Sequence, residues 1–206
     1  MSTELKTPLR LGPGVLQHLL PHRRPMLMVD QIERWERTPR PALHASRCIS
    51  SNEPVFEGHF PELALWPGVF TLEGLGQCCN ALMVLEGMLK RAQERGRQPD
   101  EVLEALRGIE LATRLQQALR PEAVEILATL AQGRNELIGF TAAVDVKFTH
   151  PVFPGQRLEY RVALAHHLGN LTRFEVEAEC EGRTVARGTM TGAYDVVPAL
   201  TTPPKK

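Results

Sequence analysis

A short stretch of this chain brings together one imidazole, one carboxylate and one expected helix start. His59 lies in a loop bracketed by prolines, and Glu73 follows fourteen residues later inside an otherwise apolar segment. A carboxylate in such a segment costs free energy unless it is paired or neutral, and burial favours the neutral acid, which can donate a proton. Gly68 stands at the expected helix start, where a free N–H and the positive end of the helix dipole can receive a developing oxyanion. The stretch therefore offers a base, an acid and an oxyanion donor.

These residue types also have structural explanations. A single histidine in a loop is usually structural or solvated, and a single glutamate in an apolar helix is usually paired in a salt bridge. Residue type and spacing alone therefore leave both acid–base catalysis and structural roles open for His59 and Glu73.

The elements that must position this stretch follow from hydrophobic periodicity and from proline and glycine breaks. Apolar residues at every third or fourth position predict helices over 14–20, 68–90, 99–119 and 121–132, the last ended by Gly133. Alternating residues predict strands over 26–34, 42–49, 137–150, 157–167, 171–181 and 184–197. This order indicates an α+β fold in which one long helix packs against an antiparallel sheet. Gly74 and Gly76 weaken that helix, and we expect another backbone to approach it closely there.

Composition excludes several classes of function. The chain has 206 residues, in which 24 Lys and Arg balance 24 Asp and Glu, so it lacks the basic excess of a nucleic-acid binder or a polybasic membrane-surface protein. No apolar run approaches the roughly 20 residues that cross a bilayer, and no secretory signal is visible. The four cysteines have no C-x-x-C spacing and are expected to be buried, reduced thiols. These observations indicate a cytoplasmic protein.

No motif for a metal or a nucleotide cofactor is visible. His166 and His167 are adjacent, so they point apart on a strand, and no H-E-x-x-H pattern occurs. Gly12-Pro13-Gly14 is too short for a phosphate loop and precedes no strand. We therefore expect no metal and no cofactor.

Three separated stretches resemble one protein family. They are 20–30, with the sequence LPHRRPMLMVD; 52–77, with Gly58-His59-Phe60-Pro61, Pro67-Gly68-Val69, Glu73 and Gln77; and Lys147-Phe148 with 151–155. Their order and spacing resemble the β-hydroxyacyl-(acyl-carrier-protein) dehydratases of fatty-acid synthesis, over about three quarters of the chain. The resemblance implies the hot-dog fold, in which an antiparallel sheet wraps a long central helix.

The resemblance also implies dehydration of a 3-hydroxyacyl thioester to the trans-2-enoyl thioester. His59 would remove the proton alpha to the thioester carbonyl, Glu73 would protonate the departing hydroxyl, and the Gly68 N–H would polarise the carbonyl. Gln77, one helical turn past Glu73, would orient that carboxylate, and Phe60 would bind substrate. Because the histidine and the carboxylate face each other across a dimer interface in this family, we expect a homodimer with shared active sites.

Two features of this region leave the substrate open. Glu rather than Asp at position 73 resembles the branch of the family that only dehydrates. The family usually has Gly and Pro where this chain has Glu62 and Ala64, so the length and substituents of the acyl group are not determined by the resemblance. The sequence also does not distinguish a substrate on acyl carrier protein from one on coenzyme A. Trp66 in the same loop is either a wall of the substrate pocket or part of the core.

Docking of an acidic carrier protein is assigned to a few cations. Lys147 matches the family's third stretch, in which Thr149-His150 replace its usual basic residues. Arg157 and Arg23 are possible substitutes. His22, in the first stretch, is expected to be structural.

The main departure from the family is an insertion at about 91–135 within a single domain, 1–206, whose ends at 1–12 and 198–206 are expected to be loose. Its two amphipathic helices need an apolar surface to cover. They would form a lid, an element packed on the sheet or a docking site for a synthase partner, and they favour a dimer over a hexamer.

Two other functions are compatible with the same fold. A hot-dog thioesterase would use a carboxylate and water to release free thiol. A non-catalytic member would bind acyl chains or scaffold a synthase. The pairing of His59 with Glu73 favours the dehydratase over both.

Overall fold

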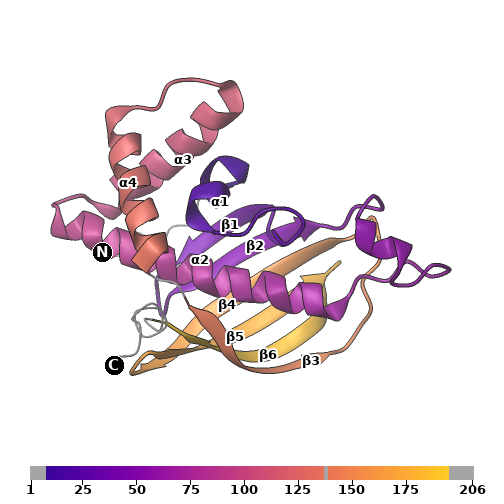
Figure 1. Ribbon diagram of the computed structural model, residues 1–206. Helices are drawn as coiled ribbons and strands as arrows, with labels where there is room; N and C mark the ends of the chain where they lie inside the picture. Colours follow the sequence, from indigo (N-terminus) through magenta and orange to yellow (C-terminus); the bar gives the residue numbers. More distant parts are fainter. Residues whose placement is uncertain (1–7, 137–138, 195–206) are drawn as a thin grey trace, which may run out of the picture.

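A six-stranded antiparallel sheet with a long helix across one face dominates the computed structural model, which describes residues 8–136 and 139–194 (Figure 1). The strands follow the spatial order β1-β2-β4-β5-β6-β3. They are β1 (Gln31–Glu36), β2 (Ala42–Cys48), β3 (Phe140–Phe148), β4 (Arg157–Leu168), β5 (Leu171–Cys180) and β6 (Arg183–Ala193). The helices are α1 (Pro13–Leu19), α2 (Gly68–Glu94), α3 (Pro99–Leu115) and α4 (Pro121–Glu136). The predicted α+β arrangement, with the long helix α2 against the sheet, is confirmed.

The first predicted strand begins later than its sequence pattern suggested. Strand β1 starts at Gln31, and 26–30 form a turn and an irregular segment instead. The Asp30 N–H donates to the Ser46 carbonyl of β2 at 2.8 Å. Earlier in the segment a side chain takes the place of a strand, because the Gln77 amide donates to the Met26 carbonyl at 2.6 Å and accepts from the Met28 N–H at 2.9 Å. Met28 and Val29, two of the apolar residues that suggested a strand, are buried without belonging to one, whereas Met26 is exposed.

The N-terminal segment is more ordered than predicted. Leu9 and Leu11 are buried, and Leu11 forms an antiparallel bridge with Ile32, with N···O distances of 2.8 and 3.0 Å. The expectation of a loose end over 1–12 is therefore wrong from Leu9 onward. Three predicted features lie outside the described residues. They are the loose end at 198–206, the start of a predicted strand at Leu137 and the end of the last predicted strand at Val197.

Helix α4 continues through Gly133, which was expected to end it. A Cβ at Gly133 would lie 3.0 Å from Nη1 of Arg91 on α2, so this glycine allows two helices to pack closely. The glycine serves packing rather than termination.

Helix α2 is the one described helix that is long and apolar enough to cross a membrane, by length and composition alone. The expectation that no segment meets this criterion is therefore wrong. However, α2 packs against the sheet and buries residues such as Leu75, Leu82 and Leu85. This is the position of a core helix, which passes the same test.

Gly74 sets how closely α2 approaches strand β4. A Cβ at this position would lie 2.5 Å from the Tyr160 hydroxyl, and Tyr160 is only 1% exposed. The Tyr160 hydroxyl has no hydrogen-bond partner among the described residues. The close neighbour is thus an aromatic side chain and not the backbone that we expected. Gly76 is less crowded, with Met190 Cε at 3.5 Å from its would-be Cβ.

Three of the four cysteines lie inside the fold. Cys78, Cys79 and Cys180 are buried, whereas Cys48 is exposed at the end of β2, so the expectation of buried thiols is wrong for Cys48. Burial raises the pKa of the Cys78 and Cys79 thiols, which keeps both protonated.

The inserted helices α3 and α4 pack on α1 and α2, and not on the sheet as one expectation had it (Figure 1). Glu110 of α3 is buried and accepts a hydrogen bond from the Val15 N–H of α1 at 3.2 Å and from Arg114 Nε at 2.7 Å. A Cβ at Gly12 or Gly14 would lie within 3.0 Å of Glu110 oxygens. The Gly-Pro-Gly sequence therefore allows α3 to dock on α1.

Replacing Gly74 by alanine should destabilise the fold. The added methyl group must displace α2 or the Tyr160 ring, which costs about 1–3 kcal/mol of unfolding free energy. Tyr160→Phe removes a buried hydroxyl without a partner and should cost less than about 1 kcal/mol. Urea unfolding of both variants and of the double variant measures this, and the double variant should recover part of the loss. Wild-type stability of Gly74→Ala would contradict the close contact.

Candidate active site

Glu73 projects from the N-terminal part of α2 and is held by a neighbour one turn later. Gln77 Nε2 donates to Glu73 Oε1 at 2.8 Å. The Gln77 side chain is 2% exposed, and its oxygen accepts the Met28 N–H while its nitrogen also donates to the Met26 carbonyl. Because an N–H can meet only the oxygen, this pattern sets the orientation of the amide. Gln77 therefore makes the contact with Glu73 that an orienting role requires.

The Glu73 side chain is less buried than its apolar sequence context suggested. Its side chain is 33% exposed in the single chain. The helix around it is apolar, but the side chain points toward a cavity and not into the core. One chain therefore leaves the acid only partly covered.

A second histidine, which sequence reasoning treated as structural, lies next to Glu73. His22 Nε2 is 3.4 Å from Glu73 Oε1, and both side chains are one-third exposed. His22 precedes Glu73 by 51 residues, so no local spacing connects them. The one sequence signal was the position of His22 within a family motif.

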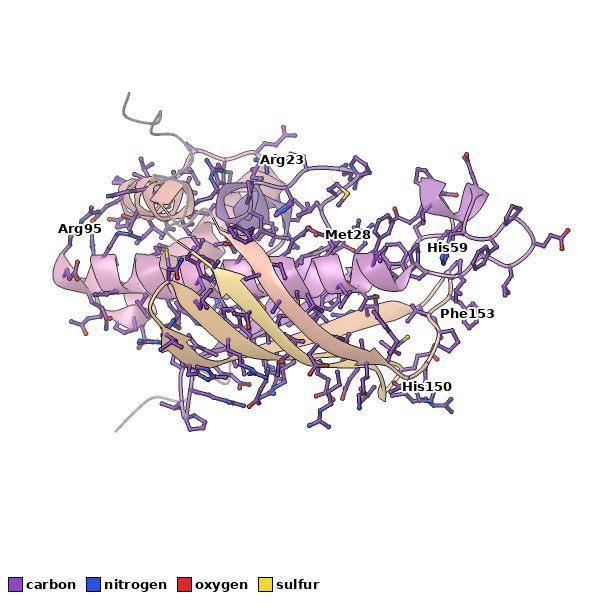
Figure 2. All side chains as sticks on the ribbon, turned by 60° about the horizontal axis from the view of Figure 1, so that its bottom comes forward. Arg23, Met28, His59, Arg95, His150 and Phe153 are labelled. Carbon is purple, nitrogen blue, oxygen red and sulfur yellow. The ribbon has the colours of Figure 1, made fainter. Side chains whose placement is uncertain are left out.

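His59 lies in the loop beside the N-terminal end of α2, whereas Arg95 marks the other end of that helix (Figure 2). The Nδ1 atom of His59 lies 2.8 Å from the carbonyl oxygen of Leu65. A carbonyl only accepts, so Nδ1 carries the hydrogen and the Nε2 lone pair of the neutral ring is available as a base. The Phe60 ring stacks on the imidazole with centroids 4.3 Å apart.

A buried arginine that sequence reasoning did not identify holds this loop. Arg47 of β2 donates to the Leu27 carbonyl at 2.9 Å and to Asp30 Oδ1 at 3.2 Å, and it also pairs with Glu53. Its guanidinium lies 5.8 Å from the centroid of the Trp66 ring. The two flanks of the site, 27–30 and 53–66, are thus joined through one side chain. A lone arginine in an alternating strand carries no signal of this role.

Of the two roles open for Trp66, the structure favours the core. The indole is 4% exposed and packs against Phe56 and Phe70, with ring centroids at 6.2 and 5.3 Å. Trp66 does not line the cavity beside Glu73. The assignment of Trp66 to substrate binding stays a prediction.

Gly68 begins α2, as predicted, so its N–H has no acceptor within the helix. A Cβ at this position would lie 3.0 Å from the Phe148 ring of β3. The absence of a side chain lets β3 pass close to the positive end of a 27-residue helix. A backbone donor and the end of a helix dipole therefore meet at this point.

A cavity of about 560 Å³ lies beside Glu73. It follows α2 from Val69 to Asn80, a helix length of about 16 Å, and its opposite wall comes from β3, β5 and β6. Its lining includes Glu73, Gln77 and His22, but His59 does not line it. Apolar side chains make up much of the rest, among them Val69, Leu72, Phe140, Val144, Phe174 and Met190. The acid and the expected base thus do not share this cavity within one chain.

Strand β3 forms an edge of the sheet and is exposed almost throughout. Phe140, Val144 and Phe148 on this strand are exposed apolar residues, as are Val69 on α2 and Phe60 in the His59 loop. An apolar edge strand is normally paired or covered, since it otherwise invites association. Because Phe140 and Val144 also line the cavity beside Glu73, the exposed edge borders the candidate site.

The three cations expected to dock a carrier protein differ in their surroundings. Arg157 pairs with Glu33, and Arg23 donates to the carbonyls of Gln17, Leu20 and His22 at 2.7–2.9 Å. Lys147 on β3 is exposed. The two arginines are therefore engaged within the chain.

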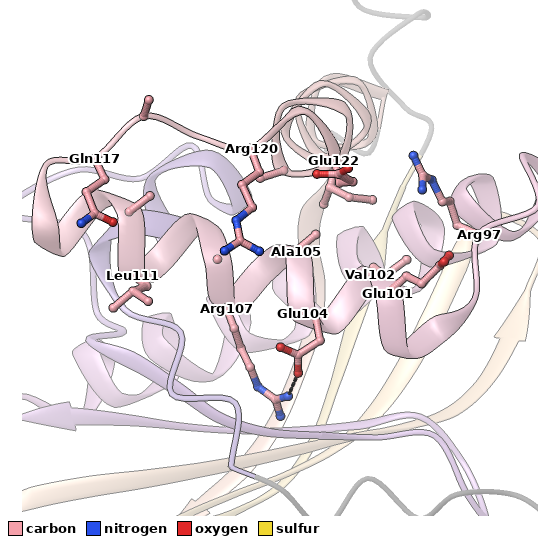
Figure 3. A pocket seen from close by; sticks show the side chains of 15 residues that line it. Arg97, Glu101, Val102, Glu104, Ala105, Arg107, Leu111, Gln117, Arg120 and Glu122 are labelled. Atoms are coloured by element: carbon pink, nitrogen blue, oxygen red, sulfur yellow. Dashed lines mark hydrogen bonds and ion pairs between the residues drawn. The ribbon is translucent and has the colours of Figure 1, made fainter.

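A second cavity, of about 510 Å³, lies between α3 and α4 (Figure 3). Arg97, Arg107 and Arg120 line it together with Glu101, Glu104 and Glu122, and Arg107 pairs with Glu104. It contains none of the expected site residues.

Comparisons with known proteins identify the family of this chain. Residues 20–107 match the FabA-like domain family. The chain is 31% identical over 181 residues to the 3-hydroxyacyl-[acyl-carrier-protein] dehydratase FabZ of Colwellia psychrerythraea. This alignment covers 88% of this chain and 90% of the relative. It is 28% identical over 177 residues to the corresponding FabZ of Campylobacter curvus, in an alignment that covers 85% of this chain and 91% of the relative.

A solved structure also supports the fold. A chain of the dehydratase heterocomplex ApeI:P from Xenorhabdus doucetiae aligns with a TM-score of 0.51 and 14% identity, over 91% of this chain and 97% of that chain. The expected hot-dog fold is thereby confirmed. Together with the matched motifs around His59 and Glu73, these likenesses show that the chain belongs to the FabZ family of 3-hydroxyacyl-[acyl-carrier-protein] dehydratases.

Proposed function

We propose that this protein dehydrates 3-hydroxyacyl thioesters of acyl carrier protein to trans-2-enoyl thioesters, in fatty-acid or polyketide-type synthesis. The observation that carries this proposal is one carboxyl group, that of Glu73, held by Gln77 at 2.8 Å on the wall of an elongated, mainly apolar cavity. Such a cavity suits an acyl chain, and such a carboxyl group suits proton transfer to a hydroxyl near the thioester. The FabZ relatives, which are named as dehydratases of these substrates, support the same reaction.

The chemistry divides between a base, an acid and a backbone donor. The Nε2 lone pair of His59 takes the proton alpha to the thioester carbonyl, and the electrons of that C–H bond form the new C=C bond. The bond from the β-carbon to the hydroxyl oxygen breaks, and Glu73 gives its proton to that oxygen, which leaves as water. Negative charge that grows on the thioester oxygen is stabilised by the Gly68 N–H and the positive end of α2.

The active unit is a homodimer in which each site combines groups from both chains. His59 does not line the cavity that holds Glu73, so His59 of the partner subunit would complete it. Pairing of two β3 edges would cover the apolar side chains of that strand, together with Val69. Phe60, stacked on His59 and exposed, would then lie against the substrate.

The remaining features fit a single cytoplasmic dehydratase domain over 1–206. The inserted helices pack on α1 and α2, which supports a role as part of the scaffold. Lys147 is exposed on β3, so it would contact the acidic carrier protein, whereas Arg157 and Arg23 are engaged within the chain.

His59→Ala should abolish turnover and leave the fold intact. Loss of one positioned acid–base group costs about 10²–10⁴-fold in rate. The measurement is the mass loss of water from 3-hydroxyacyl thioesters of several lengths, on acyl carrier protein and on coenzyme A, with the melting temperature as the control for folding. Near-native rates in the alanine variant would refute the assignment of the base. Release of free thiol without dehydration would indicate a thioesterase.

Gln77→Met should lower both activity and stability. Methionine has a similar length but leaves the Met28 N–H and the Glu73 carboxyl without their partner, which costs about 1–3 kcal/mol of stability. We expect kcat to fall about tenfold or more, because Glu73 loses its fixed orientation. Gln93→Met, at an exposed position of the same helix, is the matched control. Equal kcat in the two variants would exclude an orienting role for Gln77.

Mixing two inactive variants should restore activity if the sites are shared. A heterodimer of a His59→Ala chain and a Glu73→Gln chain has one site with both groups intact. After unfolding and refolding together, random pairing should give about a quarter of wild-type activity. Each variant refolded alone is the control. If the mixture stays inactive although heterodimers form, the two groups act within one chain.

A further inference from the structure

Two nitrogen atoms approach the same oxygen of Glu73. Gln77 Nε2 lies 2.8 Å from Oε1, and His22 Nε2 lies 3.4 Å from the same atom. No described residue forms a hydrogen bond or an ion pair with Oε2. The two oxygens of this carboxyl group therefore have different surroundings, although the group is chemically symmetric.

The environment of His22 indicates which of its nitrogens carries the hydrogen. Its Nδ1 is buried and has no hydrogen-bond partner among the described residues. An imidazolium, or a neutral ring with its hydrogen on Nδ1, would bury an N–H donor without an acceptor, which is costly. A neutral ring with its hydrogen on Nε2 instead directs that donor at Glu73. His22 therefore places the nitrogen that carries its hydrogen 3.4 Å from Oε1, whereas Gln77 already donates a hydrogen bond to that oxygen.

Two donors on one oxygen determine where an acidic proton can sit. A carboxyl oxygen has two lone pairs in the plane of the group. At Oε1 the Gln77 N–H occupies one of them, and a rotated His22 ring would occupy the other. The proton of the neutral acid then resides on Oε2. We propose that His22 is a positioning residue for Glu73, which together with Gln77 keeps the acidic proton on Oε2, the oxygen that remains available to the substrate. This inference rests on the proposed dehydration, in which Glu73 is the proton donor.

The chain holds His22 in place from both sides. Arg23 donates to the carbonyl oxygens of Gln17, Leu20 and His22 itself, which ties the end of α1 to the His22 backbone. On the other side, Gln77 binds Met26 and Met28. The 3.4 Å contact is longer than a normal hydrogen bond, as is common before substrate binds and closes a site. Little backbone movement is available, so a rotation of the ring would shorten it.

The test compares His22→Phe with His22→Gln. Phenylalanine keeps a ring but has no donor, whereas the glutamine amide can reach the position of the imidazole Nε2. We expect His22→Phe to lower kcat about tenfold, with KM nearly unchanged, because one hydrogen bond to the reacting acid is lost. His22→Gln should recover most of that loss. His18→Phe, four residues earlier in the same segment, is the matched control and should keep wild-type kcat.

The possible results distinguish a failure of the positioning role of His22 from a failure of the proposed dehydration. A kcat for His22→Phe equal to that of wild type would overturn the positioning role. Equal losses in His22→Phe and His22→Gln, or a loss accompanied by a lower melting temperature and a higher KM, would also overturn it and indicate that the ring merely packs. Absence of dehydration in the wild-type protein would instead refute the proposed function itself.

Discussion

The Gln77 amide is the contact on which the rest of the site depends. Its single nitrogen and single oxygen bind three groups in two parts of the chain: the acid on α2, and the Met26 carbonyl and Met28 N–H of the segment before β1. A buried amide is costly unless its groups are satisfied, and here all of its contacts are made within the chain. The same interaction that orients Glu73 therefore also holds the segment before β1 in a non-strand conformation.

The acid and the base are held by different side chains, and Arg47 links the segment that Gln77 binds to the loop that carries His59. Gln77 and α2 hold Glu73, whereas His59 is held by Leu65 and by a loop that Arg47 connects to β2. The two groups are separated within one chain, and an apolar edge, β3, is left exposed next to the site. Association of two chains is one explanation for both observations, because it would bring His59 of one chain to Glu73 of the other and would pair the exposed β3 edges. Assembly and catalysis would then depend on the same surface.

Sequence reasoning predicted the elements better than their contacts. Proline starts and apolar spacing predicted all four helices, and alternation predicted the last four strands to within a few residues. The first strand was placed too early because the apolar residues before Gln31, such as Met28 and Val29, are buried without forming a ladder. Within the site, the contact between Gln77 and Glu73 follows from helical spacing. The contacts of His22 and Arg47 do not, since both depend on residues distant in sequence whose pairing only the fold determines.

The insertion is connected to the acid through a chain of contacts. Glu110 on α3 binds the first turn of α1, and the glycines at its start leave room for that contact. The last turn of α1 is tied by Arg23 to His22, which lies beside Glu73. A helix of seven residues thus separates the inserted helices from His22. These contacts place the inserted helices and α1 in one packed unit that ends beside Glu73.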